Sequence, residues 1–264
     1  MTTTPGPAAS DAPRAWKTVL EHVEQALLDG TLRPGDRLPG ERQLSTDLGV
    51  GRSSVREAIR VLEVLGLIRT RSGSGPNAGA IIVATPRGGM SALMRLQVAA
   101  QGFPVDDVVR TRLLLEASVV GELAAAAHEH DLADALQLLE AMEPPGLDPE
   151  EFLALDAQFH VALAEASGNQ VITAMMAGLR SAIEGYVLAG VPHIPHWGET
   201  ADRLRAEHRE IVRAIDAGDP DAAAARIRDH IAGYYAESLL DPRAPATSPT
   251  QTQTTTQTQT PTPR

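Results

Sequence analysis

The sequence of 264 residues contains no cysteine, which excludes disulfide bonds and metal sites built from thiolate ligands. It also lacks an unbroken hydrophobic run of about eighteen residues, the length that a membrane-spanning helix needs. The first residues, MTTTPGPAASDAPRAW, do not show the basic and then apolar order of a secretion signal. These absences predict a cytoplasmic protein that does not enter a membrane.

Positive charge is scarce overall but unevenly distributed. The formal net charge is -11, yet residues 14–87 hold eleven basic and eight acidic residues, whereas residues 88–243 hold eleven basic and twenty-five acidic residues. The first part is therefore mildly basic and the second strongly acidic. This division favours a nucleic-acid-binding module joined to a domain with a different task.

Composition divides the chain into four segments. Residues 1–13 are rich in threonine, proline and alanine, and residues 242–264 end in a threonine, glutamine and proline tract. Both are predicted to be disordered, because such segments bury too little apolar surface to offset the entropy of ordering. Between them, residues 14–87 and 88–241 are each long enough to form a domain with its own core.

Residues 16–83 have the pattern of three helices followed by a β-hairpin. Apolar residues recur at helical spacing over about 16–27, a Pro-Gly turn precedes a short helix over about 40–48, and a third helix follows over about 52–65. The stretch LIRTRSGSGPNAGAIIV then has apolar ends around a glycine-rich middle, which is typical of a two-stranded wing. This order predicts a winged helix-turn-helix.

The third predicted helix begins with side chains suited to DNA. Arg52 and Arg56 lie in its first two turns, where the helix dipole disfavours a cation by about 0.3–1 kcal/mol, so helix stability does not explain them. Arginine pairs with guanine in the major groove, and Ser53 and Ser54 suit phosphate oxygens. Arg42, on the preceding helix, is placed to hold the DNA backbone or a neighbouring base. A solvated arginine face is the alternative, and the surrounding turn, helix and wing disfavour it.

Beyond residue 87 the pattern is helical throughout. Alanine- and leucine-rich segments with helical spacing are separated by short breakers, and none alternates like a strand. They lie near residues 89–101, 106–129, 131–142, 149–167, 169–189, 198–217 and 220–240. The predicted fold class is therefore mainly α, with a winged helix-turn-helix and a small β wing followed by an all-α antiparallel bundle of six or seven helices.

Four polar residues fall on the apolar stripes of this bundle. Asp156 and His160 lie one helical turn apart among leucines, His208 lies on the stripe of a later helix and His230 on that of the last. A single inward histidine is more often a satisfied core residue. Four buried polar groups without partners would cost about 1–3 kcal/mol each, however, and one divalent cation would satisfy them all. The set suits zinc first, and also nickel, manganese or iron(II).

The stretch LRPGDRLPGERQLSTDLGVGRSSVREAIRVLEVLGLIRTRSGSG closely resembles the DNA-binding domain of the GntR family of bacterial transcription regulators. The resemblance implies that the arginines and serines named above contact DNA and that Gly73 lies near the wing tip. The sequence departs from the family at Gly51, where serine or threonine usually caps the recognition helix, and in its longer wing. Glycine caps a helix acceptably but cannot make a hydroxyl contact with phosphate.

The second half resembles the FCD effector domain of FadR-type members of that family. The stretches RLLLE, DAQFHVALAEASGN and EHREIVRAIDAGDPDAAAARIRDHI carry this resemblance. It implies a metal-binding set: Asp156, His160, His208 and His230. It also implies that Arg112 meets an effector carboxylate, although an ion pair with Glu116 would explain that arginine equally well. Asn169, in the family's Gly-Asn signature, is a candidate effector contact whose alternative role is only to cap a helix.

Together these features predict a homodimeric, ligand-responsive transcription regulator without catalytic residues, and a repressor is favoured over an activator. Two winged helices would read the half-sites of a palindromic operator in double-stranded DNA, and a small organic or sugar acid would bind the metal and Arg112. In a bacterial cell the protein is expected in the cytoplasm, at the nucleoid when bound to DNA. Three alternatives stay open: a structural metal beside a hydrophobic effector, a metalloenzyme domain fused to a DNA-binding head, and a constitutive architectural DNA binder.

Overall fold

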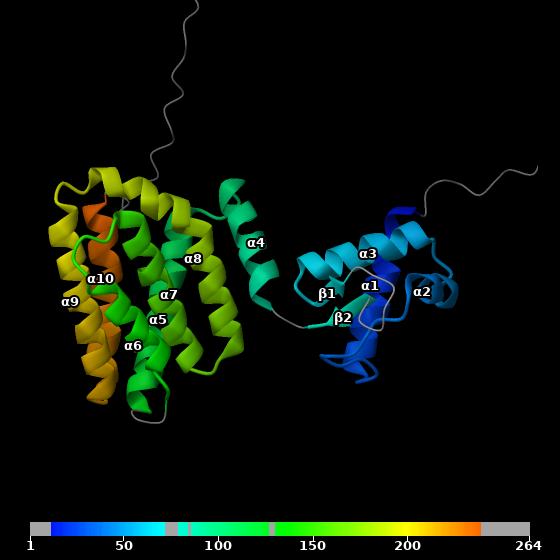
Figure 1. The fold of residues 1–264 in the computed structure, drawn as a ribbon, viewed down its shortest axis with the longest axis horizontal. Helices are drawn as coiled ribbons and strands as arrows, with labels where there is room; N and C mark the ends of the chain where they lie inside the picture. Colours follow the sequence, from blue (N-terminus) through cyan, green and yellow to red (C-terminus); the bar gives the residue numbers. More distant parts are fainter. Residues whose placement is uncertain (1–11, 72–78, 84–85, 127–129, 239–264) are drawn as a thin grey trace, which may run out of the picture.

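The computed structural model describes residues 12–71, 79–83, 86–126 and 130–238. In Figure 1 the helices form two bodies, a small N-terminal domain and a larger helical bundle, with α4 on the side of the bundle that faces the small domain. The small domain consists of α1 (Ala12–Leu28), α2 (Glu41–Leu48), α3 (Arg52–Val64), β1 (Ile68–Arg71) and β2 (Gly79–Ile82). Gly73, the predicted contact near the wing tip, lies outside the described residues, as do both predicted tails apart from the start of α1.

The small domain confirms the predicted winged helix-turn-helix. Helix α1 packs on α3 because both turn an apolar stripe inward, and Val19 and Val55 are fully buried where they meet. Leu44 of α2 closes the same cluster. Gly49 ends α2 with a φ of 64°, a left-handed conformation that glycine adopts without steric cost. The chain can therefore turn directly from α2 into α3.

The wing is an antiparallel pair of strands that is fixed to α3. The Glu63 carboxylate accepts hydrogen bonds from the Thr70 backbone N–H at 2.9 Å and from its hydroxyl at 2.5 Å. The stretch 35–38, predicted only as part of a turn, also pairs with the outer edge of β2, where the Leu38 N–H donates to the Ala80 carbonyl at 2.9 Å. These contacts set the orientation of the wing relative to α3.

The second body confirms the predicted helical bundle. Its elements are α4 (Pro86–Ala99), α5 (Val105–Ala125), α6 (Ala133–Met142), α7 (Pro149–Ala166), α8 (Gln170–Gly190), the short 3-10 turn η1 (Val191–His193), α9 (Trp197–Asp216) and α10 (Pro220–Glu237). Each helix turns its apolar stripe toward one shared core. Fully buried members of that core include Phe152, Phe159, Ile211 and Ile227. Helices α5, α7, α9 and α10 therefore surround the centre of the domain.

Helix α8 is the most apolar long helix described. Residues Gln170–His193 are long and apolar enough for a membrane span by length and composition, with a mean hydropathy of 1.3. In the fold, 44% of the most apolar 18-residue stretch in this segment is buried, because α8 packs against α4, α5 and α7. Packing within the bundle therefore accounts for its apolar character.

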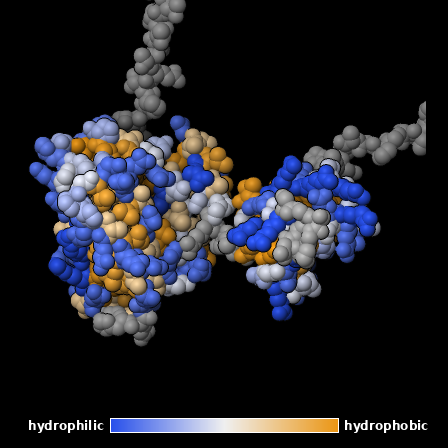
Figure 2. Space-filling model, viewed as in Figure 1, coloured by the Kyte–Doolittle hydropathy of each residue, from blue (hydrophilic) through white to orange (hydrophobic). Residues whose placement is uncertain are grey.

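The two bodies meet at the start of α4. A side-chain carbon added to Gly89 would lie 2.7 Å from the carbonyl oxygen of Leu65, which directly follows α3, so only glycine allows this close approach. Figure 2 shows that the visible face of the small domain is largely hydrophilic, whereas the bundle mixes hydrophobic and hydrophilic residues. Helix α4 thus contacts the small domain at its first turn and α8 along its length.

Candidate metal centre and DNA-binding helix

The two arginines near the start of α3 differ in their ion pairing. Arg52 is exposed at the first position of the helix and has no ion-pair partner within the described ranges. Arg56 is also exposed, but its Nε donates to the Glu41 carboxylate on α2 at 2.7 Å. A surface pair of this kind is worth about 0–1 kcal/mol, so DNA could displace it. Arg52 is the freer of the two guanidinium groups.

The structure separates the two serines that the sequence treated alike. Ser53 is exposed, whereas Ser54 is 8% exposed and faces the packed side of α3. The Ser53 hydroxyl therefore has freer access to a phosphate. Gly51 caps α3 without any side-chain hydrogen bond, as the departure from the family pattern predicts. Arg42 is exposed on α2.

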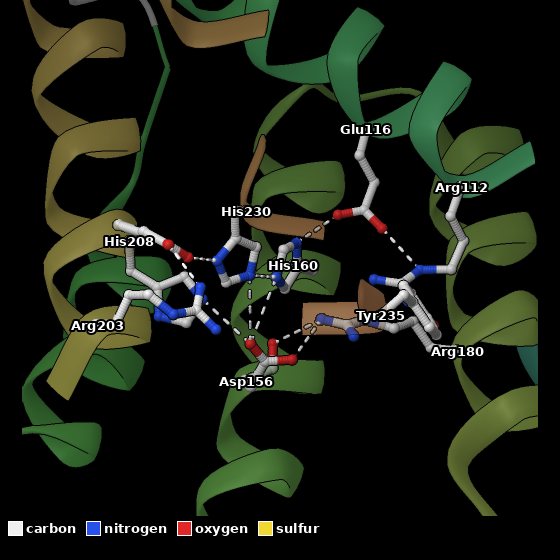
Figure 3. Close-up of polar contacts among 10 residues, drawn as sticks. Arg112, Glu116, Asp156, His160, Arg180, Arg203, His208, His230 and Tyr235 are labelled. Carbon is white, nitrogen blue, oxygen red and sulfur yellow. Dashed lines mark hydrogen bonds and ion pairs between the residues drawn. The ribbon is translucent and has the colours of Figure 1, made fainter. Parts of the chain in front are cut away.

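The four predicted metal ligands converge at the centre of the bundle. Asp156 and His160 come from α7, His208 from α9 and His230 from α10, and all are buried. Figure 3 shows the four side chains pointing toward one another. Each offers one ligand atom, and these atoms all lie within 4.8 Å of one another. Helical periodicity alone turned each residue inward, and the packing of three helices brings them together.

The spacing of these atoms fits a shared divalent cation. Asp156 Oδ1 lies 3.1 Å from His208 Nε2, 3.6 Å from His160 Nε2 and 3.7 Å from His230 Nε2, and the last two nitrogens are 3.2 Å apart. Ligands about 2.1 Å from one ion would lie roughly 3.0 Å apart at right angles and roughly 3.4 Å apart in a tetrahedron. Within the described residues, His208 Nδ1 has no hydrogen-bond partner, and the contact of Nε2 with Asp156 Oδ1 is not a well-aligned hydrogen bond, so a cation would satisfy a poorly paired buried group.

The protonation states of His208 and Asp156 also suit metal ligation. Burial, reinforced by the neighbouring His230, lowers the pKa of His208 to about 3, so this imidazole is neutral near pH 7. Burial alone would raise the pKa of Asp156, but the charges of Arg180 and His160 outweigh it and hold that pKa well below its usual range. A neutral imidazole and an ionised carboxylate are the forms that bind a metal ion.

Two further carboxylates, from α5 and α9, orient the histidine rings. The Glu116 carboxylate contacts His160 Nδ1, and His230 Nδ1 donates to Glu207 Oε2 at 2.9 Å. Such contacts aim the opposite ring nitrogen, Nε2, at the centre. From the sequence, Glu116 was predicted only as a partner of Arg112, and no role was predicted for Glu207. Its position on an apolar stripe could have indicated that Glu116 contacts the metal-binding set. Glu207 directly precedes His208 and lies off the apolar stripe, so it had no such indication.

Arg112 is enclosed in this structure. It is 2% exposed, and its Nε donates to Glu116 Oε1 at 2.9 Å while Nη1 donates to the Tyr235 hydroxyl at 2.9 Å. The ion pair that was the alternative explanation for Arg112 is therefore present, and it links this arginine to His160 through a shared carboxylate. Asn169 accepts hydrogen bonds from backbone N–H groups in the first turn of α8, so it caps that helix, and it lines neither of the two cavities described below.

A small cavity lies beside the metal ligands, and a larger groove opens to the surface. The inner cavity measures about 20 Å³ and is lined by residues that include Arg112, Asp156 and Tyr235. Since one water needs about 10–15 Å³, the cavity is too small for an organic acid in this conformation. The groove between α6, α7 and α8 measures about 660 Å³, and Arg180 lines both spaces.

Replacing Glu116 with glutamine should weaken metal binding about 10- to 100-fold. Glutamine keeps the size of the side chain but removes the charge that faces His160 Nδ1, and competition with a chelator of known affinity would measure the loss. Glu122→Gln is the matched control, because Glu122 lies on the same helix but is exposed, and among the described residues its carboxylate accepts a hydrogen bond only from the Ser118 hydroxyl. Equal metal affinities for the two variants would contradict an orienting role for Glu116.

Comparisons with known proteins agree with this architecture. Residues 16–76 match the family described as "Bacterial regulatory proteins, gntR family", and residues 107–233 match the FCD domain. The "HTH-type transcriptional repressor NanR" of Citrobacter rodentium (strain ICC168) is 30% identical over 226 residues, which cover 81% of each chain. The "Glc operon transcriptional activator" of Escherichia coli (strain K12) is 28% identical over 220 residues, which cover 81% of this chain and 85% of the relative.

A solved structure shares the fold of most of this chain. The protein described as "Streptococcus agalactiae GntR" superposes with a TM-score of 0.57 at 26% identity, covering 82% of this chain and 96% of that one. These relatives are transcription regulators, and one is named as an activator and another as a repressor. With its winged helix-turn-helix followed by an FCD effector domain, the chain belongs to the GntR family of bacterial DNA-binding transcription regulators and resembles its FadR-type members.

Proposed function

We propose that this regulator is a cytoplasmic, homodimeric repressor whose effector domain, residues 88–241, binds a divalent metal ion together with a small organic or sugar acid. Acid binding would change how two DNA-binding domains, residues 14–87 of each chain, sit on a palindromic operator. The observation that carries the proposal is the convergence of three imidazoles and one carboxylate from three helices at the centre of the helical core.

The residues present fit the metal and a carboxylate ligand. Asp156, His160, His208 and His230 would hold the ion, with zinc expected first for a set rich in imidazole. When bound, the ion would supply an electrophilic site for a carboxylate oxygen. Arg112 faces the same cavity and uses two of its five donors in contacts with Glu116 and Tyr235. Its remaining donors would hold a second carboxylate oxygen.

Contacts along α4 support a coupling route to DNA. Gly178 of α8 packs closely against Met90 and Met94 of α4, where an added side-chain carbon would lie 3.3 Å from both. The first turn of α4 in turn touches Leu65 beside the recognition helix. A shift of α8 on ligand binding would therefore move α4 and with it the DNA-binding domain. A coupling free energy of about 1–3 kcal/mol is enough to change operator affinity roughly 5- to 150-fold.

Metal analysis and operator binding together test the proposal. Purified protein should hold one metal ion per chain, and a panel of organic and sugar acids should include one that changes operator affinity at least about fivefold, an effect that a chelator removes. Operator affinity that responds to neither acid nor chelator would contradict the proposal and favour a constitutive DNA binder. Turnover of the acids would favour a metalloenzyme instead.

A further inference from the structure

Two arginines, the buried Arg112 and the nearly buried Arg180, face the inner cavity. Arg112 extends from α5, and Arg180 extends from α8 on the same side of the cluster (Figure 3). Arg180 Nη2 donates to Asp156 Oδ2 at 2.9 Å and to the Asp156 backbone carbonyl at 3.0 Å. Each guanidinium is thus paired with a carboxylate that has a second task, since Glu116 also contacts His160 and Asp156 belongs to the metal-binding set.

The charges around the cavity do not balance once a divalent ion is bound. Arg112 and Arg180 carry two positive charges, Glu116 and Asp156 carry two negative charges, and ligating imidazoles are neutral. The ion adds two positive charges. Glu207 does not correct this excess, because it lies at a partly exposed position and pairs with Arg203. Uncompensated charge in a buried site is costly, so the site calls for a ligand that brings two negative charges.

Arg180 also stands where a ligand would arrive. Along with Leu153 and Val187 it lines both the inner cavity and the larger surface groove, so its side chain forms part of the wall between them. Its Nε is buried and has no hydrogen-bond partner among the described residues. An anion at this wall would therefore find an unused donor. The groove side also carries exposed carboxylates such as Glu150 and Glu184, which disfavour placing an acidic group further out.

We propose that the effector is a short-chain dicarboxylate and that Arg180 binds its second carboxylate. This inference rests on the proposed function, in which the metal-binding set and Arg112 receive the first carboxylate. A monocarboxylate would leave one positive charge of the site unpaired. A dicarboxylate would neutralise both excess positive charges. Its second carboxylate would also pair with Arg180 once Asp156, the present partner of Arg180, coordinates the metal ion.

Titration calorimetry on the full-length, metal-loaded protein tests the inference with two acids of equal carbon number, succinate and butyrate. Succinate should bind at least about tenfold more tightly. Arg180→Gln should keep its metal, lose at least about tenfold in succinate affinity and bind butyrate as the unmodified protein does. Arg180→Lys, which keeps the charge, should recover part of the loss. Arg226→Gln is the control, because Arg226 is an exposed arginine on α10 that pairs with Glu210.

The outcomes separate this inference from the proposed function. Equal affinities for succinate and butyrate, or an Arg180→Gln variant that binds succinate normally, would overturn the dicarboxylate assignment while the metal and a monocarboxylate effector stand. Loss of the metal from Arg180→Gln would show that Arg180 serves to hold Asp156, and it would also overturn the assignment. Absence of metal from the unmodified protein would refute the proposed function and this inference together.

Discussion

Replacing His208 with alanine should abolish stoichiometric metal binding. His208 is the ligand that α9 contributes, it is fully buried, and its Nε2 lies 3.1 Å from Asp156 Oδ1. Without it the ion would lose one of four protein ligands and the contact with that helix, and its site would be left with a void. Metal content measured by mass spectrometry after reconstitution should fall from one ion per chain to near zero, and the acid response should weaken with it.

The control for this variant is His193→Ala, which removes an exposed histidine from the turn between α8 and α9 and should leave metal content unchanged. His208 also packs against the Phe159 ring, with centroids 4.7 Å apart, so alanine will cost some stability. His208→Gln fills more of the void and keeps the test valid should the alanine variant be poorly folded. Full metal content in either folded variant would refute the ligand assignment.

Replacing Arg52 with alanine should remove about 1–3 kcal/mol of the preference for operator over random DNA. Arg52 is exposed at the first position of α3 and has no ion-pair partner within the described ranges. Its guanidinium is therefore available for bidentate contact with a guanine in the major groove. Binding to operator and random duplexes, measured at two salt concentrations, gives both the preference and its salt dependence.

Arg110→Ala is the matched control, because it removes one exposed positive charge from the effector domain, where Arg110 forms a weak ion pair with Asp107 at 4.0 Å. The Arg110→Ala variant should prefer operator over random DNA as strongly as the unmodified protein does. If Arg52→Ala weakens binding to both duplexes equally and lowers the salt dependence, Arg52 contacts phosphate instead of a base. Unchanged discrimination would remove Arg52 from sequence readout altogether.

The order and type of the elements could be predicted from sequence because their signals are local. Helical spacing of apolar residues predicts α3 and the helices of the bundle, and glycines such as Gly49 and Gly66 mark where helices end. The same spacing turned Asp156, His160 and the later histidines toward the core. The added pairing of residues 35–38 with β2 left no such local signal, since it depends on a strand more than forty residues away.

By itself, the sequence determined which side chains turn inward, since the period of an α-helix is a property of each segment alone. Only the tertiary structure decided which inward groups meet. It paired Arg180 with Asp156 and Glu207 with His230, placed Arg180 between the cavity and the groove, and buried Ser54 while leaving Ser53 exposed. The reason is that these contacts depend on the rotation and spacing of helices packed against one another, and side-chain packing across the whole domain sets both.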